Sequence, residues 1–361
     1  MNDIELKTIA IDGKARLNEV TVNGKQFQTP LFMPVATRGA LKSLPFNYLE
    51  HTDIILANTY HLFLRPGLDV IKEFDGLHKF IGWNKVILTD SGGFQGWSIP
   101  NRFNDDGIEF KNIYDGSKFF MDPKLSMDIQ QTLNSDIAMI LDSLIDINKE
   151  YDEQLNAINT TQQWANIARN YHSNKNQSLF GIVQGGKHKE LREKSATDMM
   201  TIDFDGYAIG GLAIGETPEE RKEIVNFTVE MLPKNKLRYV MGLGDIEGML
   251  DLIELGVDIF DCVWPARLAR HGKIINKGKF LNLKNSKYKK DTDPLVVGCR
   301  CFVCLNFSKA YLRHLLTNEP TSAWFYLTLH NIIQTENILN EVKKSILNSE
   351  FDKYKESILN G

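Results

Sequence analysis

Three of the four cysteines are crowded into the pattern Cys299-X-Cys301-X-X-Cys304. Thiols this close together are poorly placed to bridge distant loops as disulfides, and in a reducing compartment they are typical metal ligands. Three thiolates and one imidazole form the closed tetrahedral set of a structural zinc ion. His330, in LTLHNI, and His314, in YLRHLL, both qualify as the fourth ligand. The pattern therefore predicts one structural zinc ion per chain.

Two aspartates are of the type needed for substitution at a glycosidic carbon. Asp90 follows the apolar run VILT, and Asp261 ends the run VDIFD. In such chemistry one carboxylate attacks the anomeric carbon, while the other manages the protons of the leaving group. Either aspartate alone would serve equally well as a helix cap or as the partner of an arginine. The hypothesis of a paired site thus depends on whether the fold brings the two together.

Three glycine pairs also follow apolar runs, in the segments DSGGFQ, VQGG and IGGL. Glycine allows a ligand to approach the backbone closely, because there is no Cβ in the way. In the first segment Phe94 offers a flat face, and the Gln95 amide is both a donor and an acceptor. Backbone amides and carbonyls exposed by these glycines are suited to reading the edge of a planar heterocycle. We expect a nucleobase-like ligand at these loops.

A basic segment begins immediately after Asp261. Its cations are interleaved with Tyr288 and His271, and they are Arg267, Arg270, Lys273, Lys277, Lys279, Lys284, Lys287, Lys289 and Lys290. A run of charge is usually only a solvated surface. A polyanion bound along this one, however, would lead directly to the candidate nucleophile, with affinity drawn largely from released counterions. The position of the segment favours RNA as a partner.

All of these residues must be positioned by the apolar, β-branched runs that precede them. Eight runs recur, each followed by a polar or glycine-rich stretch and a segment with helical charge patterning: LFMPV, IILA, VILT, IAMIL, LFGIV, GYAIG, RYVMG and VDIFD. Eight β-then-α units predict a parallel (β/α)8 TIM barrel, whose strands converge at their carboxyl ends. One pocket should therefore collect Asn58, Asp90, Asp142, Gln184, Gly210, Gly211, Met241 and Asp261.

The composition is that of a globular protein with a large core, since 42% of the 361 residues are apolar and 24% are charged. No run approaches the roughly 18 apolar residues of a membrane span, and the amino end lacks the apolar core of a signal peptide. We therefore expect a cytoplasmic protein that does not enter a membrane. We expect a catalytic barrel over residues 1–275, and a basic, zinc-binding region with carboxyl-terminal helices over residues 276–361.

Over nearly its whole length the sequence resembles the tRNA-guanine transglycosylases. The resemblance is carried by the cysteine cluster with its distant histidine and by the segments NTYHLFLRPG, DSGGFQ, FGIVQGG, GYAIGGLAIGE, RYVMGLG and FDCVWPARLAR. It implies a barrel with a zinc-binding insertion that acts as a homodimer in the bacterial branch. In that family an aspartate displaces the guanine at the wobble position of tRNA and stays covalently attached until a 7-deazaguanine base takes its place, as in queuosine biosynthesis.

The resemblance implies a role for each matching residue. Asp261 would be the nucleophile, and Asp90 would be the general acid/base that also contacts the base. The base would be sandwiched by Phe94 and Met241 and bound at its edge by Asp142, Gln184, Gly211 and Leu212. The tRNA would be contacted by Asn58, His61, Gln95, Arg267 and Arg270. The family's spacing makes His330 the zinc ligand in preference to His314.

One departure from the family concerns the incoming base. After Asp142, bacterial members usually carry an acid and then a cysteine, whereas this chain has Ser143 and Leu144. Leu144 offers no hydrogen bond to the cation of 7-aminomethyl-7-deazaguanine, although the carbonyl of the Leu212 peptide, supported by Glu216, would still do so in this family. We expect 7-aminomethyl-7-deazaguanine as the incoming base, with queuine second because its apolar ring would pack on Leu144.

Two alternatives belong to other functional classes. A non-catalytic tRNA-binding partner subunit would have lost the chemistry, yet Asp90, Asp261, Phe94 and Met241 are all in place. A retaining glycoside hydrolase on the same fold also uses paired carboxylates, but it needs neither a zinc module nor a basic segment. Only a transglycosylase would incorporate labelled guanine into tRNA.

Overall fold

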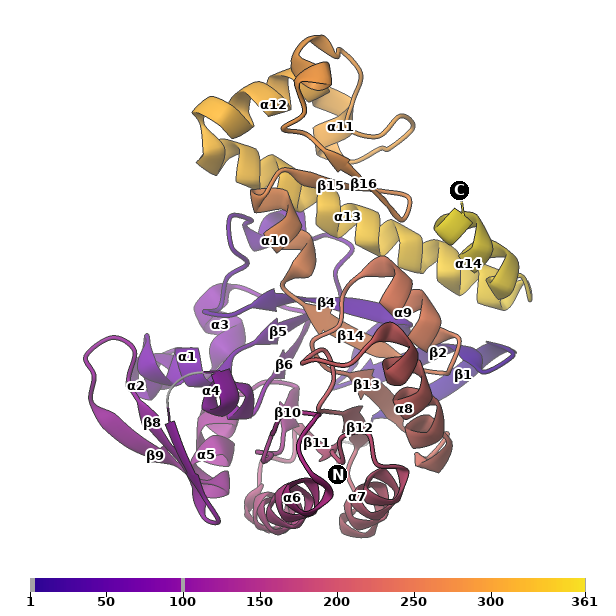
Figure 1. The fold of residues 1–361 in the computed structure, drawn as a ribbon. Coiled ribbons are helices and arrows are strands. Elements are labelled where there is room, and N and C mark those ends of the chain that lie inside the picture. The colour runs from indigo at the N-terminus through magenta and orange to yellow at the C-terminus, as the bar shows by residue number, and fades with distance from the viewer. Residues whose placement is uncertain (1–3, 99–100, 361) are drawn as a thin grey trace.

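Eight parallel strands close into a barrel at the centre of the chain, in a computed structural model that describes residues 4–98 and 101–360 (Figure 1). The strands are β4 (Leu31–Ala36), β5 (Ile54–Ala57), β6 (Val86–Thr89), β10 (Ile137–Met139), β11 (Ser178–Val183), β12 (Gly206–Ile209), β13 (Leu237–Val240) and β14 (Ile259–Cys262). Strand β14 pairs with β4 and closes the ring. Each of the eight apolar runs supplies one strand, which confirms the predicted (β/α)8 barrel.

Helices follow the strands and cover the outside of the barrel. They are α1 (Thr59–Leu64), α2 (Leu68–Glu73), α3 (Leu77–Ile81), α4 (Gly93–Ser98), α5 (Pro123–Leu133), α6 (Tyr151–Tyr171), α7 (Lys189–Ile202), α8 (Pro218–Met231), α9 (Ile246–Ile253) and α10 (Trp264–Arg270). Their starts are fixed locally, as at α8, where Thr217 and Glu220 form a capping box around Pro218. In α6, a stripe that includes Ala157, Thr161 and Trp164 is buried against the barrel.

Two antiparallel sheets add to the barrel, and the sequence analysis did not predict either of them. The first consists of β1 (Glu5–Asp12), β2 (Ala15–Val22) and β3 (Lys25–Thr29), and the second consists of β7 (Asn101–Asn104), β8 (Gly107–Lys111) and β9 (Lys118–Met121). Strands β2, β3, β8 and β9 mix exposed and buried positions, as expected for sheets with one solvated face. Continuous apolar runs indicate strands that are buried on both faces, so strands with one solvated face give no such signal.

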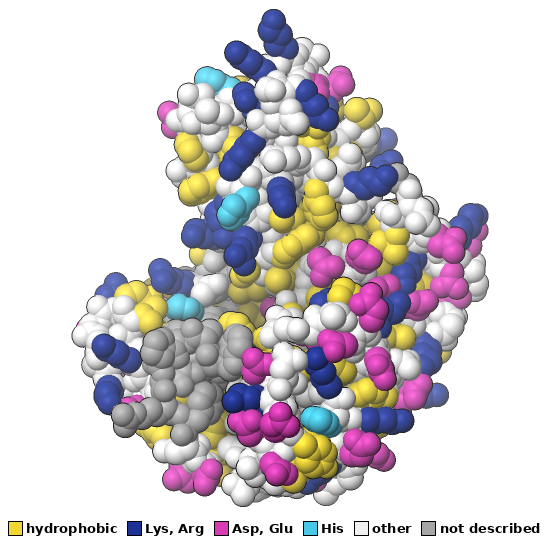
Figure 2. Space-filling model, viewed as in Figure 1, with side chains coloured by type: hydrophobic (Ala, Val, Ile, Leu, Met, Phe, Trp, Pro, Cys, Tyr) yellow, Lys and Arg dark blue, Asp and Glu magenta, His cyan; other side chains and the backbone are white. Residues whose placement is uncertain are grey.

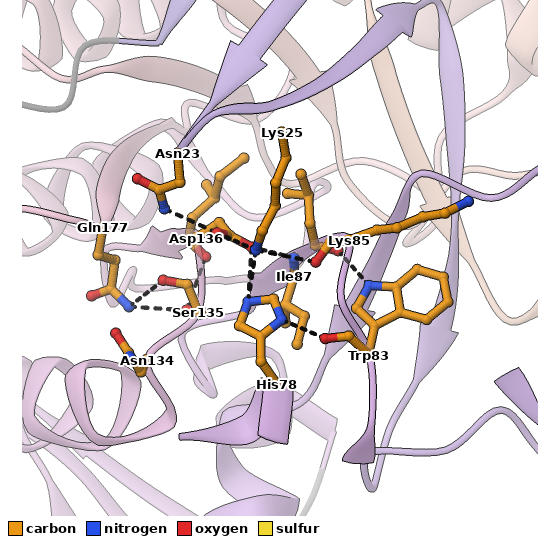
Figure 3. A network of polar contacts seen from close by, with 12 residues as sticks. Asn23, Lys25, His78, Trp83, Lys85, Ile87, Asn134, Ser135, Asp136 and Gln177 are labelled. Carbon is orange, nitrogen blue, oxygen red and sulfur yellow. Dashed lines mark hydrogen bonds and ion pairs between the residues drawn. The ribbon is translucent and has the colours of Figure 1, made fainter. Parts of the chain in front are cut away.

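A polar network ties the first sheet to the amino ends of the barrel strands (Figure 3). The buried carboxylate of Asp136, just before β10, accepts hydrogen bonds from Lys25 Nζ at 2.8 and 2.9 Å and from Asn23 Nδ2 at 2.9 Å. It also accepts bonds from His78 Nε2 and from the backbone N–H of Ile87, both at 2.9 Å. All of these donors bind the same side chain, so both carboxylate oxygens of Asp136 are fully hydrogen-bonded at this end of the barrel.

The carboxyl-terminal region forms a lobe above the barrel mouth (Figure 1). It contains the hairpin β15 (Lys273–Asn276) and β16 (Lys279–Asn282), followed by α11 (Phe302–Asn306) and α12 (Lys309–Asn318). The long helix α13 (Pro320–Leu347) contacts α11 and α12 in the lobe and also β1, β2 and β4, and α14 (Phe351–Asn360) folds back against it. The lobe is therefore held rigidly to the barrel through a shared helix. Among the described helices, none is both long and apolar enough to cross a membrane.

Candidate active site and metal centre

The carboxyl ends of the barrel strands gather the predicted polar residues at one mouth. Asp90 follows β6, Asp142 follows β10, Gln184 follows β11, and Asp261 lies within β14. Asp90 and Asp261 are near enough for the charge of one to raise the pKa of the other. The barrel thus brings together the two carboxylates that the sequence singled out.

Asp261 is held by one of its two carboxylate oxygens. Oδ1 accepts a short hydrogen bond from the Tyr239 hydroxyl and a bond of 2.8 Å from the N–H of Gly242. No hydrogen bond from the described residues reaches Oδ2. Burial raises the pKa of Asp261 and outweighs the opposing effect of these two donors. One oxygen is therefore fixed in place, while the other remains available to react.

Asp90 has surroundings that make it a proton carrier near neutral pH. Its side chain accepts a short hydrogen bond from Asn58 Nδ2 and a bond of 2.8 Å from the N–H of Thr59 at the start of α1. Burial, together with the nearby charge of Asp261, raises the pKa of Asp90 to about 7. A carboxyl group with a pKa near the working pH can both donate and accept a proton.

A second group of acceptors and donors lies beside this pair. Gln184 Nε2 donates to Asp142 Oδ2 at 2.6 Å, and burial raises the pKa of Asp142 to about 6. Gly211 has a φ of +68°, and a Cβ at this position would lie 2.6 Å from Gln184 Oε1. Glycine is therefore required there both by the backbone conformation and by the amide that packs against it. Gln184 therefore joins Asp142 and Gly211 in one group at the mouth.

Two predicted contact residues each bury a polar atom that has no partner among the described residues. The atoms are His61 Nδ1 and Gln95 Oε1. An unpaired buried polar atom costs about 1–3 kcal/mol, so both atoms are suited to bind a polar ligand. Burial and the charge of Arg38 lower the pKa of His61, which favours a neutral imidazole. Nearby in the sequence, Phe94 is half-exposed at the start of α4.

The loop after β12 is shaped by Glu216. This buried carboxylate accepts the N–H of Ala213 at 2.7 Å, the N–H of Ile214 at 3.1 Å and Arg221 Nε at 2.8 Å. Burial alone would raise its pKa, but these donors hold the pKa below the ordinary value. In a trans peptide the carbonyl points opposite to the N–H, so the carbonyl of Leu212 is directed away from Glu216.

Positive charge gathers on the lobe, and negative charge gathers on the opposite side of the mouth (Figure 2). Arg267 and Arg270 lie on α10, directly after Asp261, and the hairpin β15–β16 carries exposed Lys273, Lys277 and Lys279. The net charge of −4 conceals this segregation. An anionic chain would therefore be attracted to the lobe side of the mouth.

The cysteine cluster and His330 converge inside the lobe. Ligand atoms of Cys299, Cys301, Cys304 and His330 all lie within 4.8 Å of one another, so this group could hold a metal ion. His330 Nδ1 lies 3.4 Å from the sulfurs of Cys301 and Cys304, while Nε2 lies 3.1 Å from the carbonyl of Ile275. The carbonyl accepts the proton of Nε2 and leaves Nδ1 as the ligand atom. The competing His314 is instead exposed on α12.

Three residues that support the site escaped the sequence analysis. Tyr239 bonds the candidate nucleophile, and Thr59 bonds Asp90. Arg192, on α7, is fully buried and donates to the carbonyls of Gly186, Val183 and Gly210 at 2.8–3.0 Å. Tyr239 could have been found, because it stands two residues before Met241 in the run RYVMG, and alternate residues of an extended segment share one side. Arg192 follows no local pattern.

Comparison with known proteins identifies the family of this chain. The family model described as Queuine tRNA-ribosyltransferase matches residues 12–361. A queuine tRNA-ribosyltransferase of Dictyoglomus turgidum is 42% identical over 96% of this chain and 91% of its own length. The enzyme of Thermotoga petrophila is 43% identical over 96% of this chain and 95% of its own length. The enzyme of Bacillus subtilis is 41% identical over 95% of this chain and 91% of its own length. The chain therefore belongs to the queuine tRNA-ribosyltransferase family, the tRNA-guanine transglycosylases.

Proposed function

We propose that this enzyme exchanges guanine at the wobble position, 34, of tRNA for 7-aminomethyl-7-deazaguanine through a covalent aspartyl–tRNA intermediate. The observation that carries the proposal is the pairing of Asp261 and Asp90 at the barrel mouth. One of them has a free oxygen, and the other has a pKa of about 7. A hydrolase would need the same pair, but it would have no use for the cationic lobe beside it.

In the first half-reaction Asp261 is the nucleophile. Its Oδ2 donates an electron pair to C1′ of the guanosine, and the bond between C1′ and N9 breaks with its electrons leaving on the purine. Asp90 then gives its proton to the departing guanine. The hydrogen bonds from Tyr239 and Gly242 to Oδ1 support this assignment, because they orient the carboxylate without occupying the attacking oxygen.

The second half-reaction reverses these transfers with a different base. The incoming base loses its N9 proton to Asp90, N9 attacks C1′, and the bond between C1′ and Asp261 breaks. Both carboxyl groups return to their starting states. A single residue acts as acid and then as base most effectively when its pKa lies near the working pH, and Asp90 meets this condition.

The remaining polar residues of the mouth are assigned to the substrates. We assign the base edge to Asp142, Gln184, Gly211 and Leu212, and its two faces to Phe94 and Met241. We assign the ribose and the neighbouring nucleotide to Asn58, His61 and Gln95. The unpaired buried atoms of His61 and Gln95 support this assignment. Arg267 and Arg270 would hold the tRNA backbone.

The choice of 7-aminomethyl-7-deazaguanine is supported by the loop after β12. The N–H of Ala213 is bound by Glu216, so the carbonyl of Leu212 is free to accept a hydrogen bond from the aminomethyl cation. Queuine is the second candidate, because buried Leu144 would pack well against its apolar ring. Steady-state kinetics with both bases test the choice: a tenfold higher kcat/KM for queuine, about 1.4 kcal/mol, would reverse it.

We further propose that the metal is one structural Zn²⁺ ion per chain, since three thiolates and one imidazole suit that ion and leave no open position. Gln334 Nε2 donates to Cys299 Sγ at 3.1 Å, which stabilises a thiolate. Elemental analysis should find one zinc per chain in the wild type and much less in His330→Ala. Full retention by this variant, or the absence of zinc from both proteins, would refute the assignment.

Assembly into a homodimer is supported by exposed apolar residues on the lobe. Val297 and Leu305 are 73% and 68% exposed, and Phe302 lies close to Tyr48, so the surface is apolar enough to serve as an interface. Sedimentation should give the mass of two chains, and Leu305→Lys should lower the dimer fraction. A monomeric wild type would contradict this. We propose a cytoplasmic location, where tRNA and reduced thiolates occur together.

The exchange itself is tested with labelled guanine and an unmodified tRNA. The wild type should place the label in RNA and release it again when 7-aminomethyl-7-deazaguanine is added. Asp261→Asn should do neither, while retaining its affinity for tRNA. Wild-type protein that binds tRNA without incorporating label would instead be a non-catalytic partner subunit.

A further inference from the structure

Two aromatic side chains meet where the lobe adjoins the proposed nucleophile. Trp264 begins α10, and Phe280 lies on β16, with ring centroids 5.3 Å apart and an interplanar angle of 82°. A T-shaped pair leaves at least one face of each ring uncovered by its partner. Phe280 is 49% exposed, and neighbouring Val263 is 44% exposed. The proposed exchange reaction has given neither ring a role.

The stretch of sequence that contains this pair carries cations and no acids. No Asp or Glu occurs between Asp261 and Asp291 in the sequence. The flanking cations Arg267, Lys273 and Lys277 are exposed, and none of the three forms an ion pair with a described acid. Figure 2 shows hydrophobic side chains continuing from the cationic lobe into the hollow at the centre of this face. Exposed aromatic surface among unpaired cations is the composition of a single-stranded nucleic-acid site.

The pair also stands next to the reacting centre. Trp264 is three residues beyond Asp261, and it lines a cavity of about 290 Å³ together with Gly242 and Cys262. The N–H of Gly242 is one of the two donors that hold Asp261. A nucleotide whose C1′ lies at Asp261 therefore has its chain neighbours within reach of the two rings.

We propose that Phe280, supported by Trp264, is a stacking platform for an unpaired base adjacent to the exchanged guanosine. The inference rests on the proposed function, and it names a positioning residue for that reaction. Bases in a loop are free to unstack and to lie on aromatic side chains, whereas bases in a duplex are not. Unpaired cations on the same helix and hairpin as the two rings suit the RNA backbone better than they suit a second apolar protein surface.

The test is a double-mutant cycle between the ring and the base. Anticodon stem-loops are made with an abasic nucleotide on the 5′ or the 3′ side of the target guanosine, and guanine exchange is measured with wild type and Phe280→Ala. Loss of one stacked base reduces affinity by about 5- to 150-fold. We expect Phe280→Ala to raise KM for the intact stem-loop within this range, with kcat nearly unchanged. With one of the two abasic stem-loops, the variant should cause no further loss.

Companion variants separate stacking from other causes. Phe280→Tyr keeps a ring and should restore KM, whereas Phe280→Leu keeps only apolar bulk and should not. Phe74→Ala is the matched control, because Phe74 is 45% exposed and forms a T-shaped pair with Phe80 at 5.2 Å, at the end of α2. It should leave KM unchanged.

Three results would overturn the platform. These are additive losses with both abasic stem-loops, full rescue by Phe280→Leu, and a reduced dimer fraction in Phe280→Ala without any coupling to the RNA. None of these results affects guanine exchange by the wild type, so each would refute the stacking role of Phe280 without refuting the proposed function. Failure of the wild type to exchange guanine would instead remove the proposed function.

Discussion

The pKa values of buried carboxyl groups are shifted in opposite directions at the two ends of the barrel. At the amino ends of the strands, Asp136 accepts bonds from Lys25, His78 and Asn23; burial alone would raise its pKa, but these donors lower it. At the carboxyl ends, Asp90 and Asp261 have few donors, and burial raises the pKa of both. Both ends bury acids, but of these three only Asp136 is paired with a cation among the described residues, Lys25.

This difference assigns a task to each end. Breaking a buried pair of a carboxylate and a cation destabilises the fold, because the partner left behind is an uncompensated charge. A buried carboxylate without a cation destabilises the fold at neutral pH, yet its raised pKa makes it a proton carrier. The acids at the amino end should therefore govern stability, and those at the carboxyl end should govern activity.

The largest expected effect is on catalysis at the carboxyl end. Asp261→Asn removes the proposed nucleophile, so kcat for guanine exchange should fall by about 10⁴-fold or more, as when other enzymes lose theirs. The melting temperature should be unchanged or higher, because a buried charge is lost. A variant that keeps a tenth of the wild-type rate would break the distinction between the two ends.

The converse change is Asp136→Ala at the amino end. It leaves Lys25 and His78 without their shared acceptor, and it should lower the free energy of unfolding by about 3 kcal/mol. Denaturant unfolding measures this loss, while kcat per folded molecule should stay at the wild-type value. A loss of kcat without a loss of stability would contradict the assignment.

The pH dependence of stability should also differ between the ends. The pKa of Asp90 is raised to about 7 in the folded protein, so raising the pH from about 5 to about 8 should remove a proton that only the folded state holds and should lower stability. Asp90→Asn should flatten this slope. Asp136→Asn should not, because the contribution of Asp136 is lost only as the pH falls through its lowered pKa. Equal slopes for wild type and Asp90→Asn would be inconsistent with this account.

The smallest effect concerns the incoming base. Leu144→Cys replaces a buried apolar side chain near the carboxylate cluster with a weakly polar one, and it should raise the kcat/KM ratio of 7-aminomethyl-7-deazaguanine to queuine by a few-fold, about 1 kcal/mol. Competition between the two bases measures the ratio directly. An unchanged ratio would show that Leu144 does not contact the 7-substituent.

The sequence predicts the barrel well because its strands are buried on both faces and appear as continuous apolar runs. It also predicts the positions of Asp90 and Asp261, since residues after parallel strands converge on one face. It does not predict Asp136, whose donors come from segments as distant as Lys25 and His78. Sequence patterns report local periodicity, whereas saturation of a carboxylate depends on which segments meet after folding. The sequence therefore predicts which residues lie at the barrel mouth, while the pKa shifts of the buried acids follow only from the structure.

The proposed mechanism depends on a covalent bond between Asp261 and the tRNA. To detect this bond, the enzyme is mixed with tRNA and a slowly released base, and the mixture is then denatured. The RNA–protein adduct is digested, and the modified peptide is mapped by mass spectrometry. The account predicts a nucleotide on the peptide that contains Asp261, and no adduct from Asp261→Asn. An adduct on any other residue, or one that survives this substitution, would contradict it.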